Sequence, residues 1–286
     1  MGSILTACGG SDNKSVTIGA KNYTEQFLIS KITALYLEEN GYDVEEKKGM
    51  GSTALRKALE NGQVDFYWEY TGTALVQYLN ADPIIDPADS LEKLKELDKE
   101  NDIIWTNMSN INNTYRLGMK EDKAEELGIE TMSDLADYVD DNPGEITIAM
   151  DSEFANREDG IKGAEEHYGF DLGSGAIKEM EIGLQYQALE NGDVNTAMIY
   201  GTDPQIKEFD VRVLKDDKDF FPAYHAAISM REEVYNDDEE LEKLTGDIAD
   251  KLKNEDSIEM AYQVEVEDKS EEEAARQWLK DNDLID

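Results

Sequence analysis

One five-residue segment occurs twice in this 286-residue chain, and its recurrence limits the folds open to it. Residues Ala58–Gly62 read Ala-Leu-Glu-Asn-Gly, and residues Ala188–Gly192 read the same. A Val stands two residues after each Gly, and a Tyr stands twelve residues after each Ala, at Tyr70 and Tyr200. Each Tyr closes a strand-like run that follows a helical pattern. We therefore expect two similar units, each with a Tyr at the carboxyl end of a strand, where open α/β sheets bind ligands.

Strand and helix patterns alternate around these segments. Strands are predicted over 16–20, 42–46, 64–70 and 146–150, helices over 24–40 and 52–61, and a mainly helical end over 232–281. Such alternation predicts parallel sheets covered by helices. Gly49–Thr53 is rich in glycine but lacks the Lys of a phosphate-binding loop, so we expect it to turn a strand into a helix.

The net charge is the most unusual compositional feature. Lys and Arg total 27 against 66 Asp and Glu, which leaves −39, while 40% of the residues are hydrophobic and can form a core. Nucleic acid and anionic membrane surfaces are poor partners for such a chain, because both attract basic faces. Salt screens the self-repulsion of so many acids. The surface therefore indicates adaptation to high salt, the alternative being an acidic protein from an ordinary source.

Cysteine and histidine are scarce. One Cys and two His exclude a disulfide framework and a Cys- or His-rich metal cluster, so no metal or cofactor is expected. No apolar run of about 20 residues is present to span a membrane.

The first residues contain a candidate lipid-attachment signal. Leu5-Thr6-Ala7-Cys8 resembles a bacterial lipobox, in which the Cys becomes the lipidated first residue after a signal peptide is removed. We expect residues 1–15 to be a lipobox remnant and tether, and the protein to lie on the extracellular face of the cytoplasmic membrane, anchored through Cys8. A chance match with an inert thiol is the alternative.

Five tyrosines occupy turn-like or strand-end positions: Tyr23, Tyr70, Tyr115, Tyr200 and Tyr224. Several Tyr faces around one small volume suit a quaternary ammonium, which has no N–H to donate. Each ring contributes about 0.5–2 kcal/mol in a dry site, so four or five rings supply much of the roughly 8 kcal/mol behind a micromolar affinity. Residue physics alone does not bring these five together, and burial in a core is the alternative for each.

Several blocks together carry a family resemblance. They are Lys21–Gln26, Gly49–Thr53, Asp65–Thr73, Asn156–Gly160, Tyr200–Asp203 and Phe220–Tyr224. In order and spacing, from about residue 16 to 285, the chain resembles the substrate-binding proteins of osmoprotectant ABC importers, which take up glycine betaine, choline and carnitine. The resemblance implies an α/β, type II periplasmic-binding-protein fold with two lobes, two crossovers and a ligand cleft between the lobes. Lobe 1 would contain 16–111 and 213–286, and lobe 2 would contain 112–212.

The same resemblance implies a site with two opposite ends. Tyr70, Tyr115, Tyr200 and Tyr224 would form the ammonium cage, with Tyr23 as a fifth wall. Lys21, Thr73 and Arg157 would hold a carboxylate, with Asn22 and Thr71 as secondary contacts. Glu158 departs from the family, which often has Pro there, and a Glu beside Arg157 weakens the expected grip on the carboxylate.

The expected ligand follows from these two ends. Glycine betaine satisfies both, proline betaine and carnitine follow, and choline ranks lower because it leaves the cations uncompensated. The expected partners are this zwitterionic osmolyte and a membrane permease of the ABC type, with the binding protein acting as a monomer and not as an enzyme.

Other functions remain open at this point. A choline- or carnitine-selective member of the same family, or a sugar-binding protein of another importer, would use the same aromatic residues. An enzyme could employ His225 as a base, although no nucleophile motif accompanies it. An acidic interaction protein would bind no small molecule.

Overall fold

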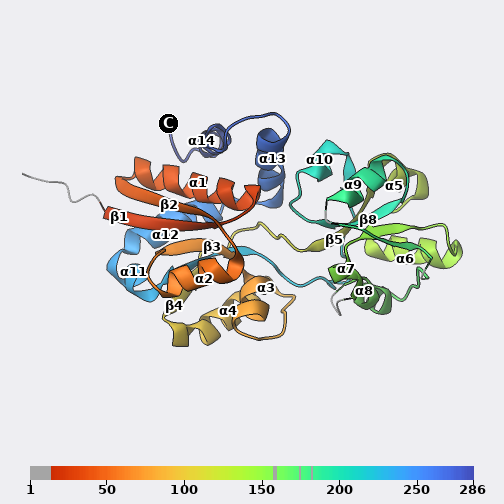
Figure 1. Cartoon of the computed structure of the whole chain (residues 1–286), viewed down its shortest axis with the longest axis horizontal. Coiled ribbons are helices and arrows are strands. Elements are labelled where there is room, and N and C mark those ends of the chain that lie inside the picture. Colours follow the sequence, from red (N-terminus) through yellow and green to blue (C-terminus); the bar gives the residue numbers. More distant parts are fainter. Residues whose placement is uncertain (1–13, 157–159, 174, 182) are drawn as a thin grey trace, which may run out of the picture.

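Two separate five-stranded sheets organise the molecule (Figure 1), for which a computed structural model describes residues 14–156, 160–173, 175–181 and 183–286. The first sheet has, in spatial order, β2 (Tyr42–Met50), β1 (Lys14–Lys21), β3 (Phe66–Tyr70), β10 (Ala226–Arg231) and β4 (Ile103–Thr106). The second has β7 (Ile177–Glu179), β6 (Ile148–Met150), β8 (Thr196–Tyr200), β5 (Tyr115–Lys120) and β9 (Val211–Val213).

Both sheets follow the same pairing scheme. Three neighbouring strands are parallel, β2-β1-β3 in one sheet and β7-β6-β8 in the other, and the remaining two strands join by antiparallel pairing. The expected α/β fold with two lobes is thus confirmed. The strands of lobe 1 precede residue 107 or follow residue 225, and those of lobe 2 lie within 115–213. The sequence-based boundaries at 112 and 213 stay predictions.

Helices cover both sheets. Lobe 1 has α1 (Thr24–Glu39), α2 (Ser52–Glu60), α3 (Thr71–Thr73), a π-helical turn (Ala74–Tyr78), α4 (Pro87–Asp98), a 3-10 turn (Lys99–Asn101), α11 (Glu232–Asp237), α12 (Glu239–Ala249), α13 (Asn254–Glu265) and α14 (Glu271–Asp281). Lobe 2 has α5 (Glu121–Leu127), α6 (Met132–Asp141), α7 (Ser152–Asn156), α8 (Ile161–Tyr168), α9 (Leu184–Glu190) and α10 (Gln205–Glu208). The predicted helices over 24–40, 52–61 and the C-terminal region are confirmed.

Local sequence signals explain where several helices begin. The Asp86 side chain accepts a hydrogen bond from the Asp89 amide ahead of α4, which has Pro87 as its first residue. Thr131 and Asp134 form a reciprocal capping box at the start of α6. Apolar side chains on the inner faces of these helices then join the cores beside the sheets, Leu94 of α4 in lobe 1 and Leu135 of α6 in lobe 2.

The repeated segment forms the same structure in both lobes. In each copy a helix ends, the Gly adopts a left-handed conformation (φ 69° at Gly62, 72° at Gly192), and a parallel strand follows. The residue after each Gly donates its amide to the carbonyl of the repeat's Ala, at 2.8 Å in lobe 1 and 2.9 Å in lobe 2. β3 then ends at Tyr70 and β8 at Tyr200, which confirms the predicted strand-end positions.

Two chain segments, 107–114 and 214–225, cross between the lobes (Figure 1). They run side by side, because Asn113 donates its amide to the Tyr224 carbonyl at 3.1 Å and Asn112 forms an antiparallel bridge with His225. A further link joins the lobes away from the crossovers: Lys207 of α10 pairs with Glu259 of α13 and lies 4.2 Å from the centre of the Tyr262 ring. The lobes are therefore also linked through α10 and α13.

Candidate functional site

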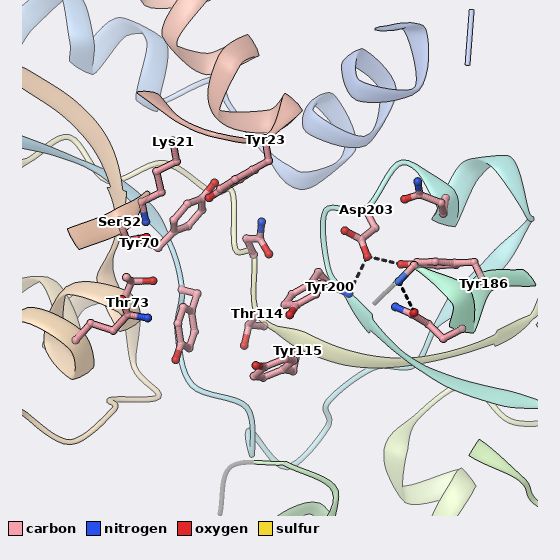
Figure 2. A pocket seen from close by; sticks show the side chains of 16 residues that line it. Lys21, Tyr23, Ser52, Tyr70, Thr73, Thr114, Tyr115, Tyr186, Tyr200 and Asp203 are labelled. Carbon is pink, nitrogen blue, oxygen red and sulfur yellow. Dashed lines mark hydrogen bonds between the residues drawn. The ribbon is translucent and has the colours of Figure 1, made fainter. Parts of the chain in front are cut away.

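A cavity of about 530 Å³ lies between the two lobes. Figure 2 shows Lys21, Tyr23, Tyr70 and Thr73 of lobe 1 on one side, and Tyr115, Tyr186, Tyr200 and Asp203 of lobe 2 on the other. The second crossover adds Tyr224 to the lining. Both walls are therefore needed to enclose a ligand.

All five tyrosines singled out in the sequence line this cavity: Tyr23, Tyr70, Tyr115, Tyr200 and Tyr224. They come from the N-cap of α1, the ends of β3 and β8, the start of β5 and the second crossover. Tyr115 and Tyr200 pair across two antiparallel strands with ring centres 5.3 Å apart. Tyr23 and Tyr70 stack at 6.4 Å. The structure thus places the rings around one volume, although their role as a cage stays a prediction.

Lys21 lies at the lobe 1 end of the cavity in an ion pair. Its side chain is buried, and its ammonium pairs with the carboxylate of Glu69, which is itself fully buried. Glu69 also accepts hydrogen bonds from the hydroxyls of Tyr67 (3.1 Å) and Tyr78 (2.7 Å). Lys21 was expected to be a point charge for a ligand, but much of its charge is already compensated inside the protein.

A second buried carboxylate holds Tyr70. Glu25, in the first turn of α1, accepts a hydrogen bond from the Tyr70 hydroxyl. It also accepts from Ser257 Oγ at 2.6 Å and from Asn113 Nδ2 at 3.2 Å. One carboxylate therefore ties a wall of the cavity to α13 and to the first crossover. Glu25 belongs to the Lys21–Gln26 block of the family resemblance, where no role was expected for it.

The remaining expected contacts fall in different places. Thr73 lines the cavity. Thr71 is fully buried and lies outside the lining. Its hydroxyl donates to the Ala223 carbonyl at 3.1 Å and accepts from the His225 amide at 3.2 Å, so it joins the start of α3 to the second crossover. Asn22 is exposed and also lies outside the lining. Arg157 and Glu158 lie outside the described residues, as does Cys8.

The lobe 2 wall contains polar groups that the sequence analysis missed. Asp203 Oδ2 accepts hydrogen bonds from the Tyr186 hydroxyl at 2.5 Å and from the Tyr200 amide at 3.2 Å. Burial raises the pKa of the Asp203 carboxyl to about 6. Gln185, next to Tyr186, also lines the cavity. Asp203 is the last residue of the Tyr200–Asp203 block, which contributes to the family resemblance. Its place in that block was the one feature of the sequence that could have pointed to it.

His225 lies in the second crossover rather than in the cavity lining. Its Nδ1 lies 2.9 Å from the Ser109 carbonyl, and burial lowers the pKa of the imidazole. Within the described ranges, no group of three or more His, Cys, Asp or Glu could hold a metal ion. No helix among these same residues is long and apolar enough to cross a membrane.

Comparison with known proteins identifies the family. The family model described as the substrate-binding domain of the ABC-type glycine betaine transport system matches residues 14–281. The chain belongs to this family. It is therefore a binding protein that delivers glycine betaine or a related quaternary amine to an ABC importer from outside the cytoplasm, and it is not an enzyme.

Individual relatives extend this family assignment. The chain is 39% identical to the glycine-betaine-binding protein of Pseudomonas aeruginosa, over 99% of this chain and 92% of that one. It is 34% identical to the ergothioneine transport permease/ergothioneine binding protein EgtU of Helicobacter pylori, over 94% of this chain and 48% of that protein. A solved structure, the crystal structure of a glycine betaine/carnitine/choline ABC transporter, matches with a TM-score of 0.87 and 30% identity, over 95% of this chain and all of that one.

Proposed function

We propose that this member of the family binds glycine betaine in the cavity between its lobes, with the trimethylammonium group inside a cage of tyrosines. The observation that carries the proposal is that all five selected tyrosines line one cavity. Tyr rings present their negative faces to a cation that has no N–H to donate. Binding proteins for neutral sugars also use aromatic residues, but the cationic groups expected at the other end of this site favour an anionic ligand group.

The carboxylate end of the ligand would lie near Thr73, Lys21 and Arg157. Thr73 offers a hydroxyl, and Arg157 would offer two parallel donors. Because Glu69 already compensates Lys21, Arg157 becomes the principal candidate for recognition of the carboxylate. Replacement of Arg157 by Ala should therefore weaken glycine betaine more than choline. Equal losses for the two ligands would refute this role for Arg157.

Transport would follow from closure of the two lobes around the ligand. Tyr70 stands on one wall and Tyr200 on the other, so a ligand that contacts both favours the closed arrangement by its differential affinity. The permease would then recognise the closed form. Small-angle scattering should show compaction with saturating glycine betaine, and an unchanged radius of gyration would count against this mechanism.

The proposed location is the extracellular face of the cytoplasmic membrane, with a lipid on Cys8. Expression behind a bacterial lipoprotein signal peptide in the presence of labelled palmitate tests this. Label should enter the wild-type protein and be lost in Cys8→Ser. Wild-type protein without label would contradict the anchor and leave the binding function untouched.

The decisive experiment for the binding function is calorimetric titration with glycine betaine, choline and maltose in about 2 M NaCl, where surface charge is screened. Glycine betaine should bind well above choline. A choline affinity that equals or exceeds the glycine betaine affinity would be compatible with the cage but would contradict the assignment of a carboxylate-binding end. Heat with maltose alone would overturn the proposal.

A further inference from the structure

Glu25 is a buried carboxylate that lies behind one wall of the cavity. It stands in the first turn of α1, and only 5% of the residue is exposed. Its Oε1 accepts hydrogen bonds from the Tyr70 hydroxyl and from Asn113 Nδ2, and its Oε2 accepts from Ser257 Oγ. All three partners act as donors, which suits an ionised carboxyl group because that group only accepts. Glu25 itself lies outside the cavity lining, whereas Tyr70 and Asn113 belong to it.

Tyr70 is the residue through which Glu25 faces the cavity. Tyr70 ends β3, is buried, and stacks on Tyr23, and Figure 2 shows both rings on the lobe 1 wall. Burial, followed by the negative charge of Glu25, raises the pKa of Tyr70 well above its usual value. The Tyr70 side chain is therefore a neutral phenol that donates its proton to a carboxylate.

A phenol that donates to a buried carboxylate has a more electron-rich ring than a phenol in water. The negative charge polarises the O–H bond, and this polarisation is stronger in a low-dielectric interior. The added electron density strengthens the negative face of the ring, which is the part that attracts a cation without an N–H. Lys21 also lies 5.0 Å from the centre of the Tyr70 ring, but it pairs with Glu69.

Resting on the proposed function, we propose that Glu25 is a positioning residue for ammonium recognition: it fixes the Tyr70 ring in the cavity wall and increases the attraction of that ring for a quaternary ammonium. Its hydrogen bonds tie one carboxylate to β3, to the first crossover through Asn113 and to α13 through Ser257. Glu25 thereby determines how well this wall distinguishes an ammonium from a neutral group of the same shape.

Two ligands of the same shape isolate this effect. Glycine betaine carries a trimethylammonium group, and the anion of tert-butylacetic acid carries a neutral tert-butyl group in its place, with the same carboxylate at the other end. A displaced ring would weaken the binding of both, whereas a ring with less electron density would weaken only the binding of the cation. Calorimetric titration gives the affinity for glycine betaine directly, and competition with glycine betaine gives the affinity for the neutral analogue.

Glu25→Gln keeps the size of the side chain and an oxygen that accepts from Tyr70, while its amide can donate to Ser257. Glycine betaine affinity should fall about fivefold, and affinity for the analogue should change less than about twofold. Tyr70→Phe breaks the same link from the side of the ring and should give the same selective loss. The double variant should lose little beyond either single variant, because both changes act on one link.

Glu38→Gln is the matched control. Glu38 is an exposed acid on the same helix, outside the cavity lining, and its replacement changes the net charge equally. Both affinities should stay as in the wild type.

Equal losses for the two ligands in Glu25→Gln, or losses that add in the double variant, would overturn this role of Glu25 and leave the proposed function standing. Unchanged glycine betaine affinity in Tyr70→Phe would do the same. Wild-type protein that does not bind glycine betaine would overturn both. Because Tyr70→Phe tests the link from the side of the ring with glycine betaine alone, it decides the matter even where Glu25→Gln fails to fold.

Discussion

Lys21 and Glu69 form a buried ion pair at the lobe 1 end of the cavity, and the Lys21 ammonium lies 5.0 Å from the centre of the Tyr70 ring. The pair therefore occupies a position beside an expected cage wall. It supplies a cation to the site without leaving an uncompensated charge in the protein when the cavity is empty.

Replacement of Lys21 by Met should destabilise the protein by about 3–5 kcal/mol, because it leaves the Glu69 carboxylate buried without its counter-ion. Urea unfolding at neutral pH measures this loss. The double variant with Glu69→Gln should recover a large part of the stability. Lys93→Met, which removes only an exposed ion pair with Glu96, should cost no more than about 1 kcal/mol. Equal losses in the two Lys variants would contradict the importance of burial.

Tyr115→Ala and Tyr200→Ala should each lose over about tenfold in glycine betaine affinity, since each removes one aromatic face from the cavity. The Phe variants keep the ring and should retain most of the affinity. Titration calorimetry gives the comparison, with Tyr138→Ala, a half-buried residue of α6 outside the cavity lining, as the control. An Ala variant that binds glycine betaine as tightly as the wild type would show that the Tyr is not part of the cage.

Gly72→Ala should weaken glycine betaine binding about tenfold without removing any group that faces the ligand. A Cβ at this position would lie 2.7 Å from the ring of Tyr224, so the ring must move out of its place in the cavity wall. Gly175→Ala meets nothing within 4 Å and serves as the matched control. Unchanged affinity in Gly72→Ala would show that the position of Tyr224 is immaterial to binding.

The melting temperature should rise between about 0.1 M and about 2 M NaCl, because salt screens the repulsion among the charges of a −39 chain. Differential scanning calorimetry measures the shift. Sucrose at matched osmolality, which does not screen charge, separates electrostatic screening from general stabilisation by solutes. A melting temperature that does not rise with NaCl would exclude adaptation to high salt.

Much of the fold could be predicted from local sequence patterns. The repeated Ala-Leu-Glu-Asn-Gly segment predicted two similar units, and each of its two copies forms the end of a helix, a left-handed Gly and a strand, in two sheets that follow the same pairing scheme. These features depend on residues close in the chain. Local apolar periodicity and the conformational freedom of Gly therefore report them directly.

The candidate site could be predicted only in part from the sequence. The resemblance selected the tyrosines that line the cavity, but it treated Lys21 as an available charge. Its partner Glu69 lies 48 positions away along the chain and is one of 66 acidic residues, so no local pattern could identify it. The same holds for Glu25, whose donors Asn113 and Ser257 come from distant segments.

By itself, the sequence determined the alternation of strands and helices, the duplication of the unit, the excess of negative charge and the family. The tertiary structure alone decided which acids are compensated: among the described residues, Glu69 pairs with Lys21, Glu25 accepts from three hydrogen-bond donors, and Asp203 accepts through one oxygen. The reason is physical. Secondary structure depends on neighbours in the chain, whereas the ionisation of a carboxylate depends on burial and on charges that folding brings near it.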